Sequence, residues 1–461
     1  MAINLSGSNV LILGAGVTGI AVAKSLSVKC AKVEFADDQA SEVAGYTVLK
    51  PDQVKISGYD FIVVSPGWKE SHPLISKAIA ANIRLVNEID LAWSFRAELV
   101  PGQRWIALTG TNGKTTTVEM AAAMLREAGV SAIACGNVGT TVIESVESSQ
   151  KYEVLVLELS SFQLHWLREA SFVASAILNI AQDHVDWHGS FSEYARVKGS
   201  ILDRSSTGIF NAGDVEVVNQ AAHWQGRKVF FSLDTPAPGE LGVVEELLVD
   251  RAFVSDPQEA AMLAEVMDVK PTVPHNVANA LAAAGLVRAL GVSPEAIRKA
   301  LQNFTLGRHR IEEVATNNGV TWINDSKATN PHAAAASLMS SLTSIWVAGG
   351  LAKGAEMSEL ISRCKSRIKA AILFGTDREL IAHELRTQAP EVPIVYIDAP
   401  SSYKKGETDN SLMEAVVKAA AELAVSGDTV LLAPACASMD QFVSYSDRGD
   451  RFAAAVKKVI K

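Results

Sequence analysis

Short apolar runs alternate along this chain with longer segments in which apolar residues recur every three or four positions. The run Asn9–Leu13 is followed by such a segment at 17–27, and the run at 105–109 is followed by another at 115–128. Runs of the first kind are typical of buried strands, and segments of the second kind are typical of helices. Their alternation predicts an α/β protein built from parallel sheets and crossover helices.

Two interruptions divide this alternation. Residues 99–102 read Leu-Val-Pro-Gly and precede a fresh strand at Trp105, and residues 304–307 read Phe-Thr-Leu-Gly after a helical stretch at 294–301. The 461 residues also exceed what one hydrophobic core normally supports. We therefore predict three α/β domains, at 1–98, 99–306 and 307–461.

Composition and charge narrow the class of protein. Hydrophobic residues make up 48% and charged residues 20%, which is typical of a globular chain. The net charge of −9 argues against nucleic acid and against anionic membrane surfaces, because both require a basic footprint. A nucleotide remains compatible with this charge, since one basic loop can hold a triphosphate.

The cysteines and the apolar runs favour the cytoplasm. Four cysteines, at positions 30, 135, 364 and 436, form no C-x-x-C pair, so we expect neither a zinc site nor a disulfide framework. Uninterrupted apolar runs are too short to span a bilayer, and the N-terminal pattern lacks the features of a signal peptide. We expect a soluble, cytoplasmic monomer without membrane insertion.

A first glycine-rich loop follows the strand Asn9–Leu13. Residues 14–19 read Gly-Ala-Gly-Val-Thr-Gly and lead into a helix, and the acidic pair Asp37-Asp38 ends the strand Lys32–Ala36. Glycines permit a tight turn there, and the helix N-terminus offers N–H groups to a phosphate. The pattern fits NAD, the diphosphate of a UDP-sugar, or a purely structural turn.

A second glycine-rich loop has the parts of a phosphate-binding loop. It follows the strand at 105–109 and reads Gly-Thr-Asn-Gly-Lys-Thr, shorter than the Walker A pattern. Backbone N–H groups would cradle the phosphates, Lys114 would meet the β- and γ-phosphate charge, and the Thr115 hydroxyl would ligate Mg²⁺. The residues predicted to hold ATP here are Gly110, Thr111, Asn112, Gly113, Lys114, Thr115 and Thr116.

Two further segments offer metal ligands. Glu158 ends a strongly apolar strand, where ligand-binding groups of α/β sheets gather, so it is the candidate carboxylate for Mg²⁺. His184 lies in a polar loop after the strand at 174–178 and is either a metal ligand or a structural histidine. Lys198 lies two turns into a helix that begins with a capping-box pattern, Ser190 to Glu193. Its position on the helix alone predicts a solvent-exposed charge.

These motifs together resemble the Mur ligase family. The resemblance rests on residues 110–117 (Gly-Thr-Asn-Gly-Lys-Thr-Thr-Thr), Glu158, His184 and residues 275–280 (His-Asn-Val-Ala-Asn-Ala). In that family a Rossmann-like first domain binds a UDP-sugar, a central P-loop domain binds ATP, and a Rossmann-like third domain brings the incoming amino acid. The resemblance implies the same three domains here.

Three more segments resemble the D-glutamate-adding branch of that family. They are 158–164 (Glu-Leu-Ser-Ser-Phe-Gln-Leu), 323–330 (Ile-Asn-Asp-Ser-Lys-Ala-Thr-Asn), and 432–442 with Arg448-Gly449 beyond it. The D-N-P-R type segment of the diaminopimelate- and lysine-adding branches is lacking. The implied activity is an ATP- and Mg²⁺-dependent ligase that joins D-glutamate to UDP-N-acetylmuramoyl-L-alanine through an acyl phosphate, with two metal ions, in peptidoglycan precursor synthesis.

The resemblance also implies roles for single residues. The residues implied to contact the UDP-substrate are Val17, Thr18, Asp37, Asp38, Ser65, Gly67, Asn137, Ser160, Gln163 and His184. Contacts to adenosine fall to Asn279, Arg310 and Asp325, and contacts to D-glutamate fall to Lys327, Thr329, Lys353, Ser438 and Tyr445. Lys198 matches a lysine that is carbamylated in the family, so the implied metal ligands are Thr115, Glu158, His184 and the Lys198 carbamate. The implied catalytic residues are Lys114, Glu158, His184 and Lys198.

Three other readings explain part of the chain. A ligase similar to folylpolyglutamate synthase would use the P-loop but not the loop at 14–19. An NAD-dependent dehydrogenase would use the loop at 14–19 but not Lys114. A nucleotide-sensing module without turnover would leave the lysines and hydroxyls of the third domain without a role.

Overall fold

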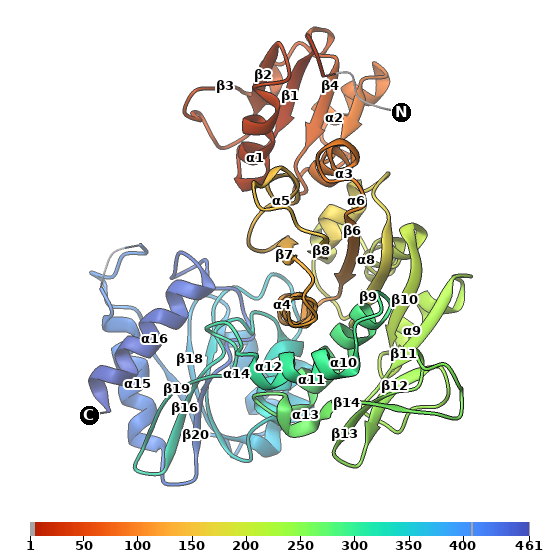
Figure 1. Cartoon of the computed structure of the whole chain (residues 1–461). Helices are drawn as coiled ribbons and strands as arrows, with labels where there is room; N and C mark the ends of the chain where they lie inside the picture. Colours follow the sequence, from red (N-terminus) through yellow and green to blue (C-terminus); the bar gives the residue numbers. More distant parts are fainter. Residues whose placement is uncertain (1–4, 407–408, 461) are drawn as a thin grey trace. The chain divides into compact units, whose positions relative to one another are not determined.

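The computed structural model of the chain describes residues 5–406 and 409–460, and its strands form three sheets flanked by helices (Figure 1). The predicted strands Asn9–Leu13 and Lys32–Ala36 have the same bounds in the structure, as β1 and β2. The α/β alternation read from the sequence is therefore confirmed.

The residues pack into two compact units. The first runs to Ile180 and adds Trp187–Thr272 and Asn276–Phe304, and it contains the first two sheets. The second comprises Ala181–Asp186, Val273–His275 and Thr305 onward, and it contains the third sheet. The domain boundaries at 98 and 306 stay predictions.

The first sheet has five parallel strands in the order β3-β2-β1-β4-β5. Beyond β1 and β2, its strands are β3 (Thr47–Leu49), β4 (Phe61–Val64) and β5 (Arg84–Val86). Its helices are α1 (Val17–Leu26), α2 (Pro73–Ala80) and α3 (Glu88–Leu99). Because β1 lies between β2 and β4, the loop after β1 lies at the point where the strand order reverses, which is where such sheets bind ligands.

The second sheet has nine strands in the order β14-β13-β12-β11-β10-β9-β6-β8-β7. They are β6 (Arg104–Thr109), β7 (Ala132–Gly136), β8 (Val154–Glu158), β9 (Phe172–Ile177), β10 (Ser205–Asn211), β11 (Arg227–Phe231), β12 (Glu240–Val244), β13 (Leu247–Asp250) and β14 (Ala261–Glu265). In this sheet order, each neighbouring pair from β7 through β6 to β12 is parallel. The pairs β12–β13 and β13–β14 are antiparallel and extend the sheet. Strand β6 lies between β8 and β9, so the loop after β6 lies at a second switch point.

The helices around the second sheet are α4 (Lys114–Glu127), α5 (Val142–Glu147), α6 (Ser161–Trp166), α7 (Val185–His188), α8 (Phe191–Gly199), α9 (Val215–Ala222), α10 (Pro274–Arg288) and α11 (Pro294–Asn303). The apolar side of α4 predicted from the sequence is buried, including Val118, Met120 and Leu125. Helix α10 is buried over most of its length, because its alanines and leucines pack into the same core as α4.

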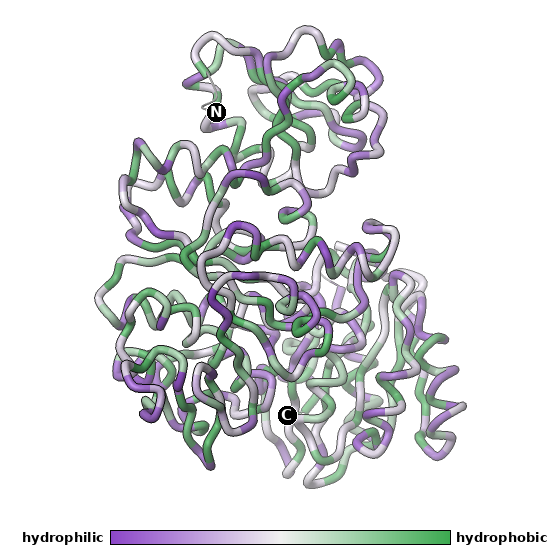
Figure 2. Tube along the Cα trace, turned by 90° about the vertical axis from the view of Figure 1, so that its right-hand side faces the viewer, coloured by the Kyte–Doolittle hydropathy of each residue, from purple (hydrophilic) through white to green (hydrophobic). Residues whose placement is uncertain are grey.

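The third sheet has six strands in the order β15-β16-β20-β17-β18-β19, with only the β15–β16 pair antiparallel. They are β15 (Glu312–Asn317), β16 (Val320–Asn324), β17 (Ser344–Gly349), β18 (Ile368–Phe374), β19 (Ile394–Tyr396) and β20 (Thr429–Leu432). The helices are α12 (Pro331–Met339), α13 (Ser358–Cys364), α14 (Arg378–Gln388), α15 (Ser411–Leu423) and α16 (Tyr445–Val459). Figure 2 shows the chain coloured by the hydropathy of each residue. All of β17 and nearly all of β18 are buried.

Buried acids at the start of α3 tie the first sheet's helices to the second sheet. The Asp90 carboxylate accepts three consecutive backbone N–H groups, those of residues 168–170, each at 2.8 Å. The Glu88 carboxylate accepts the Ile143 N–H at 2.6 Å, in the first turn of α5. Burial raises the pKa of Glu88 to about 7, although hydrogen bonds from Ile143 and Val142 oppose the shift.

Among the described residues, no helix is both long enough and apolar enough to cross a membrane.

Candidate active site

The loop between β6 and α4 requires glycine at position 113. Gly113 has a φ of 82°, in the left-handed region, and is the N-cap of α4. A Cβ atom there would lie 2.4 Å from Oδ1 of Asn279. Any side chain would therefore collide with Asn279, which packs against the loop from α10. The structure thus brings one predicted adenosine-site residue against the predicted phosphate loop.

Lys114 and the first turn of α4 make the loop electropositive. The Nζ atom of Lys114 donates to the carbonyl oxygens of Gly110 and Thr111, both at 2.9 Å. Thr115 and Thr116 lie in the first helical turn, where backbone N–H groups have no acceptor within the helix. A cation, these N–H groups and the helix dipole together favour a bound phosphate.

Glu158 is a buried carboxylate with one oxygen left unsatisfied. It ends β8 and is 2% exposed. Oε1 accepts a hydrogen bond from Asn137 Nδ2 at 3.0 Å, while Oε2 is buried and has no hydrogen-bond partner in the described part of the chain. Leaving a carboxylate oxygen buried without a partner is unfavourable, so a cation at this position would compensate.

Lys198 is buried, so its interpretation as a solvated charge is wrong. It is 2% exposed, and its Nζ atom donates to Gly110 O at 2.8 Å and to Thr109 Oγ1 at 3.3 Å. The same atom lies 4.8 Å from the centroid of the Tyr194 ring. Thr109 Oγ1 in turn donates to Leu159 O at 2.8 Å. Lys198 therefore reaches the P-loop and, through Thr109, the residue that follows Glu158.

The capping box predicted for α8 is only half formed. Ser190 Oγ accepts the Glu193 N–H at 3.1 Å, as predicted. The Glu193 carboxylate instead pairs with Arg196, at 2.6 Å, and that pair lowers the pKa of Glu193. An arginine one turn away offers a charge-assisted bond that a backbone N–H cannot match.

His184 lies in the short segment Ala181–Asp186, which belongs to the second compact unit. Its φ of 51° is in the left-handed region, and its N–H donates to Asp183 Oδ1 at 2.9 Å. The Nε2 atom lies 3.7 Å from Asp183 Oδ2. The strained backbone and the neighbouring carboxylate fit a loop built for a function.

Asp37 holds the first glycine-rich loop through hydrogen bonds to its carboxylate. Its Oδ2 accepts the Ala15 N–H at 2.8 Å, and its Oδ1 accepts the N–H groups of Gln39 and Ala40, each at 2.8 Å. Burial acts to raise the pKa of Asp37, but these backbone hydrogen bonds outweigh it and hold the pKa below its ordinary value. The carboxylate is therefore a permanent anion that braces the loop.

The remaining predicted UDP-site residues of the first sheet lie around that loop. A Cβ on Gly14 would lie 2.9 Å from Ser65, so Ser65 packs against the loop. Val17 is 76% exposed at the start of α1, which leaves an apolar surface open beside the loop. Thr18 is half-buried beside it, and Asp38 is exposed, with an oxygen 3.6 Å from the His72 ring.

Several other predicted substrate contacts already have structural partners. Ser160 and Gln163 form a reciprocal capping box at the start of α6, with the Ser160 N–H donating to Gln163 Oε1 at 2.9 Å. The Gly67 carbonyl accepts from Trp187 Nε1 at 3.2 Å. The S-x-x-Q spacing in 160–163 is a capping-box pattern, so the sequence contained the information for this local role.

In the second unit, Asp325 is a buried carboxylate at the end of β16. It accepts from the Ser337 hydroxyl and from the Ile311 N–H, the latter at 3.3 Å. Burial raises the pKa of Asp325 to about 6, against the effect of these bonds and of the Arg310 charge. Arg310 is thus close enough to influence Asp325, as expected for two residues of one predicted subsite.

Four of the five residues predicted for D-glutamate lie on three loops of the second unit, and the fifth, Tyr445, is the first residue of α16. Lys327 Nζ lies 4.0 Å from the centroid of the Tyr445 ring, a cation–π contact that joins two of them. The Thr329 N–H donates to the Lys327 carbonyl at 2.8 Å. Lys353 is exposed, with a φ of 52°, whereas Ser438 is buried.

Arg448 ties these three loops together, and the sequence analysis assigned it no role. It is fully buried, and its guanidinium donates to the Ser326 hydroxyl and carbonyl, both at 2.9 Å. It also donates to the carbonyls of Cys436 at 3.1 Å and Gly349 at 3.5 Å. Burial lowers the pKa of Arg448 to about 10, so it stays charged at neutral pH.

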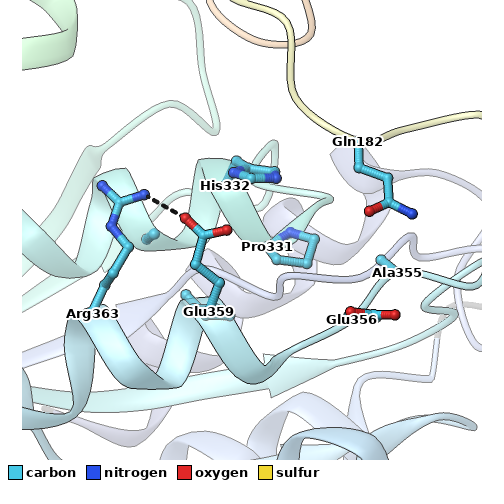
Figure 3. A pocket seen from close by; sticks show the side chains of 9 residues that line it. Gln182, Pro331, His332, Ala355, Glu356, Glu359 and Arg363 are labelled. Atoms are coloured by element: carbon cyan, nitrogen blue, oxygen red, sulfur yellow. Dashed lines mark hydrogen bonds and ion pairs between the residues drawn. The ribbon is translucent and has the colours of Figure 1, made fainter. Parts of the chain in front are cut away.

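A small pocket in the second unit lies beside these loops (Figure 3). The dashed pair in the figure joins Glu359 and Arg363, at 3.4 Å, and both side chains are exposed. The residues that line it are Gln182, Pro331, His332, Ala335, Ala355, Glu356, Glu359, Leu360 and Arg363. The predicted D-glutamate residues precede two of its segments in sequence but do not line it.

Comparisons with known proteins match this architecture. Residues 108–287 match the Mur ligase middle domain, and residues 309–436 match the Mur ligase glutamate ligase domain. The chain is 46% identical to the UDP-N-acetylmuramoylalanine–D-glutamate ligase of Streptomyces coelicolor over 479 residues, covering 100% of both chains. This chain belongs to the Mur ligase family. It is also 41% identical to the ligase of the same name from Mycolicibacterium smegmatis, over 98% of this chain and 97% of that one.

Solved structures of Mur ligases and their relatives share the fold. A pseudomurein peptide ligase type C from Methanothermus fervidus superimposes with a TM-score of 0.59 at 18% identity, covering 98% of this chain and 100% of that chain. The UDP-N-acetylmuramate–alanine ligase of Thermotoga maritima gives 0.58 at 16% identity, covering 98% and 99%. The predicted fold of three α/β domains is therefore confirmed as that of a Mur ligase.

Mur ligases depend on ATP, and the residues of the first unit fit a metal ion beside it. Glu158 supplies a buried carboxylate oxygen without a partner, and Thr115 supplies a hydroxyl in the first turn of α4. Hard oxygen donors of this kind suit Mg²⁺, which typically takes few protein ligands and fills its shell with phosphate and water. Among the described residues, no three His, Cys, Asp or Glu side chains form a metal cluster of their own.

Proposed function

We propose that this Mur ligase adds D-glutamate to the carboxyl group of UDP-N-acetylmuramoyl-L-alanine, with conversion of ATP to ADP and phosphate. The observation that carries this proposal is the 46% identity over the full length of a relative that bears this name. The half-buried P-loop lysine Lys114, the unsatisfied Glu158 oxygen and the contact of Lys327 with Tyr445 in the second unit support it. The product belongs to the synthesis of peptidoglycan precursors.

The reaction has two steps. The L-alanyl carboxylate attacks the γ-phosphorus of ATP, which forms an acyl phosphate and releases ADP. The neutral amine of D-glutamate then attacks the acyl carbon, phosphate leaves with the electrons of the broken C–O bond, and the nitrogen releases one proton as the amide forms. Lys114 and the first turn of α4 offset the charge that moves onto the β–γ bridge and the γ-phosphoryl oxygens.

Two metal positions are part of the proposal. Mg²⁺ at these positions supplies charge neutralisation for the transferring phosphoryl group. Thr115 and Glu158 would hold the first ion, and His184 with carbamylated Lys198 would hold the second. The buried Oε2 of Glu158 supports the first position.

Carbamylation of Lys198 is compatible with its contacts. The neutral amine attacks carbon dioxide, a C–N bond forms and one proton is released, which leaves a carbamate anion. The carbamate nitrogen keeps one N–H, which can still donate to the Gly110 carbonyl that Nζ contacts at 2.8 Å. That bond would orient the two new oxygens, which are ligands that Mg²⁺ prefers.

The substrates are assigned to the three predicted domains. The domain at 1–98 would bind the uridine diphosphate through Val17, Thr18, Asp37, Asp38, Ser65 and Gly67, and Asn137, Ser160, Gln163 and His184 would contact the sugar and peptide. The domain at 99–306 would bind ATP, with Arg310 and Asp325 of the third domain joining Asn279 at the adenosine. The domain at 307–461 would bind D-glutamate through Lys327, Thr329, Lys353, Ser438 and Tyr445.

The proposed setting is the cytoplasm, where ATP is available and thiols stay reduced. All four cysteines are free, and three are buried. We further propose that the enzyme acts as a monomer and, with its net charge of −9, without nucleic acid.

Phosphate release in the presence of ATP and Mg²⁺ tests the function. With UDP-N-acetylmuramoyl-L-alanine and D-glutamate both present, we expect sustained release that stops when either is omitted. D-alanine or L-lysine in place of D-glutamate should give no product. Turnover with L-glutamate and a folate acceptor, or tight NAD binding without UDP-sugar binding, would contradict the proposal.

A further inference from the structure

Asn179 contacts the P-loop from the neighbouring strand. It lies two residues beyond the end of β9, and its side-chain Oδ1 accepts the Asn112 N–H at 2.8 Å while its Nδ2 donates to the Asn112 carbonyl at 3.1 Å. The Asn179 carbonyl also accepts the Thr111 N–H at 2.9 Å. One half-buried residue thus makes three hydrogen bonds to the backbone of two consecutive loop residues.

The side-chain pair depends on the chemistry of a carboxamide. Asn presents one acceptor and one donor at the same end, so it can pair with both the N–H and the C=O of one residue, as a neighbouring strand would. A carboxylate lacks the donor, and a hydroxyl cannot span both atoms. Because the carboxamide carries no net charge, it also adds no repulsion next to a polyanionic ligand.

The loop needs this external support. It has fewer residues than a Walker A loop, and its last residue, Gly113, is in the left-handed region. The N–H groups of Thr111 and Asn112 are directed at Asn179. The backbone donors left to meet phosphate are then those at the start of α4, from Gly113 to Thr116, whose direction depends on how the loop enters the helix.

We propose that Asn179 is a positioning residue for ATP: it fixes the backbone of Thr111 and Asn112 so that the first turn of α4 and Lys114 are aimed at the β- and γ-phosphates. It does not touch the nucleotide. This inference rests on the proposed use of the loop for ATP.

Asn211 provides a matched control. It ends β10, the strand next to β9, and its Nδ2 donates to the Leu178 carbonyl at 2.8 Å. It is therefore an asparagine of the same sheet edge that braces the residue immediately before Asn179. No hydrogen bond recorded for the described chain runs from its side chain to residues 110–113.

The test measures binding of a fluorescent ATP analogue with Mg²⁺, together with the three substrate KM values and the melting temperature. Asn179→Ala should weaken analogue binding and raise KM for ATP by about 10-fold or more, because two backbone hydrogen bonds to the loop are lost. KM for the UDP-substrate and for D-glutamate should change less than about 2-fold. Asn211→Ala should leave analogue binding near that of the unmodified enzyme.

Asn179→Asp adds a readout that a merely structural role would not give. The introduced carboxylate cannot donate to the Asn112 carbonyl and places a negative charge beside the phosphates, so binding should weaken more than in Asn179→Ala at pH 8. A protonated carboxyl again offers one donor and one acceptor, so binding should recover as the pH falls toward about 4, the ordinary pKa of an aspartic acid. The unmodified enzyme should lack this recovery.

The outcomes distinguish a failure of the proposed function from a failure of the positioning role. If the unmodified enzyme binds no ATP analogue, the proposed function fails. If it binds the analogue and Asn179→Ala binds it equally well, the positioning role fails while the function stands. Equal rises of all three KM values, matched by Asn211→Ala, would likewise overturn the positioning role.

Discussion

The first unit holds two glycine-rich loops in the same architectural position, and they are braced by different chemistry. Each loop follows the strand at which the sheet order reverses and leads into a helix, α1 in one case and α4 in the other. Each is held from the side by one polar residue that follows a neighbouring strand. In the first loop this residue is Asp37, a carboxylate, and in the second it is Asn179, a carboxamide.

The charge of the brace separates two loops that look alike in sequence. Asp37 accepts three N–H groups and leaves a fixed negative charge beside its loop, and one of those groups, from Ala15, is lost to any phosphate. The second loop has a neutral brace and a cation, Lys114, whose Nζ atom donates to the Gly110 carbonyl. The second loop therefore suits a triphosphate, whereas the first suits a ligand that carries less negative charge.

The largest expected effect comes from removing the cation of the second loop. Lys114→Ala should lower the ligation rate by roughly 10³-fold, because the charge that meets the γ-phosphate is lost. Phosphate release measures the rate, and circular dichroism should show an unchanged fold. Lys77→Ala, an exposed lysine near the end of α2, serves as the control and should retain full activity. Near-normal turnover of Lys114→Ala would remove the main difference between the two loops.

The second-largest effect concerns Lys198. Lys198→Arg keeps a positive charge but cannot form the carbamate, so we expect a loss of roughly 10²-fold or more in ligation rate. Lys198→Ala should be equally impaired, and added acetate should restore part of its activity by occupying the carbamate position. Because Lys198 is buried, binding of a fluorescent ATP analogue should confirm that each variant is folded. Full activity of Lys198→Arg would rule out the carbamate.

A smaller effect should follow from neutralising the brace of the first loop. Asp37→Asn retains one acceptor oxygen but turns an NH₂ group toward backbone N–H donors that Asp37 now satisfies. We expect a loss of about 1–3 kcal/mol in the free energy of unfolding, measured by urea denaturation, and a raised KM for the UDP-substrate. KM for ATP should not change. A raised KM for ATP with an unchanged KM for the UDP-substrate would reverse the assignment of the two loops.

The smallest effect concerns a third buried brace, the Glu88 carboxylate at the start of α3, which accepts a hydrogen bond from the first turn of α5. Its folded pKa of about 7 lies above the unfolded value of about 4.3, so the folded state favours the protonated form. The stability that this gives is fully present below about pH 4.3 and is lost as the pH rises through about 7. Glu88→Gln keeps an acceptor for the Ile143 N–H, so its free energy of unfolding should fall less between pH 5 and pH 7.5 than that of the unmodified protein. Parallel pH profiles would show that Glu88 is ionised throughout.

The parts of the fold that follow from local pattern could be predicted from the sequence. The bounds of β1 and β2 and the position of Glu158 at the end of β8 follow from apolar runs and from the rule that ligand groups gather at strand ends. The antiparallel extension from β12 to β14 was not predicted, because strand direction depends on partners that one strand's pattern does not record.

The site shows the same division. Lys114 and Thr115 belong to a contiguous motif, so their place was predictable, whereas the burial of Lys198 depends on which face of α8 packs against the P-loop. Asn179 and Arg448 act on backbone atoms of segments far away in the chain. No pattern of residue types marks such contacts, so the sequence analysis assigned neither a role.

Trp68 gives the first loop an optical property of its own. A Cβ on Gly14 would lie 3.1 Å from Trp68 Nε1, and the indole packs edge-on against His72 at 4.5 Å. The emission of an indole depends on the polarity and the quenching groups around it, so a uracil ring seated beside this loop would change it. The enzyme therefore contains an intrinsic fluorophore at the proposed UDP end, and a titration with UDP alone can be followed without label or turnover.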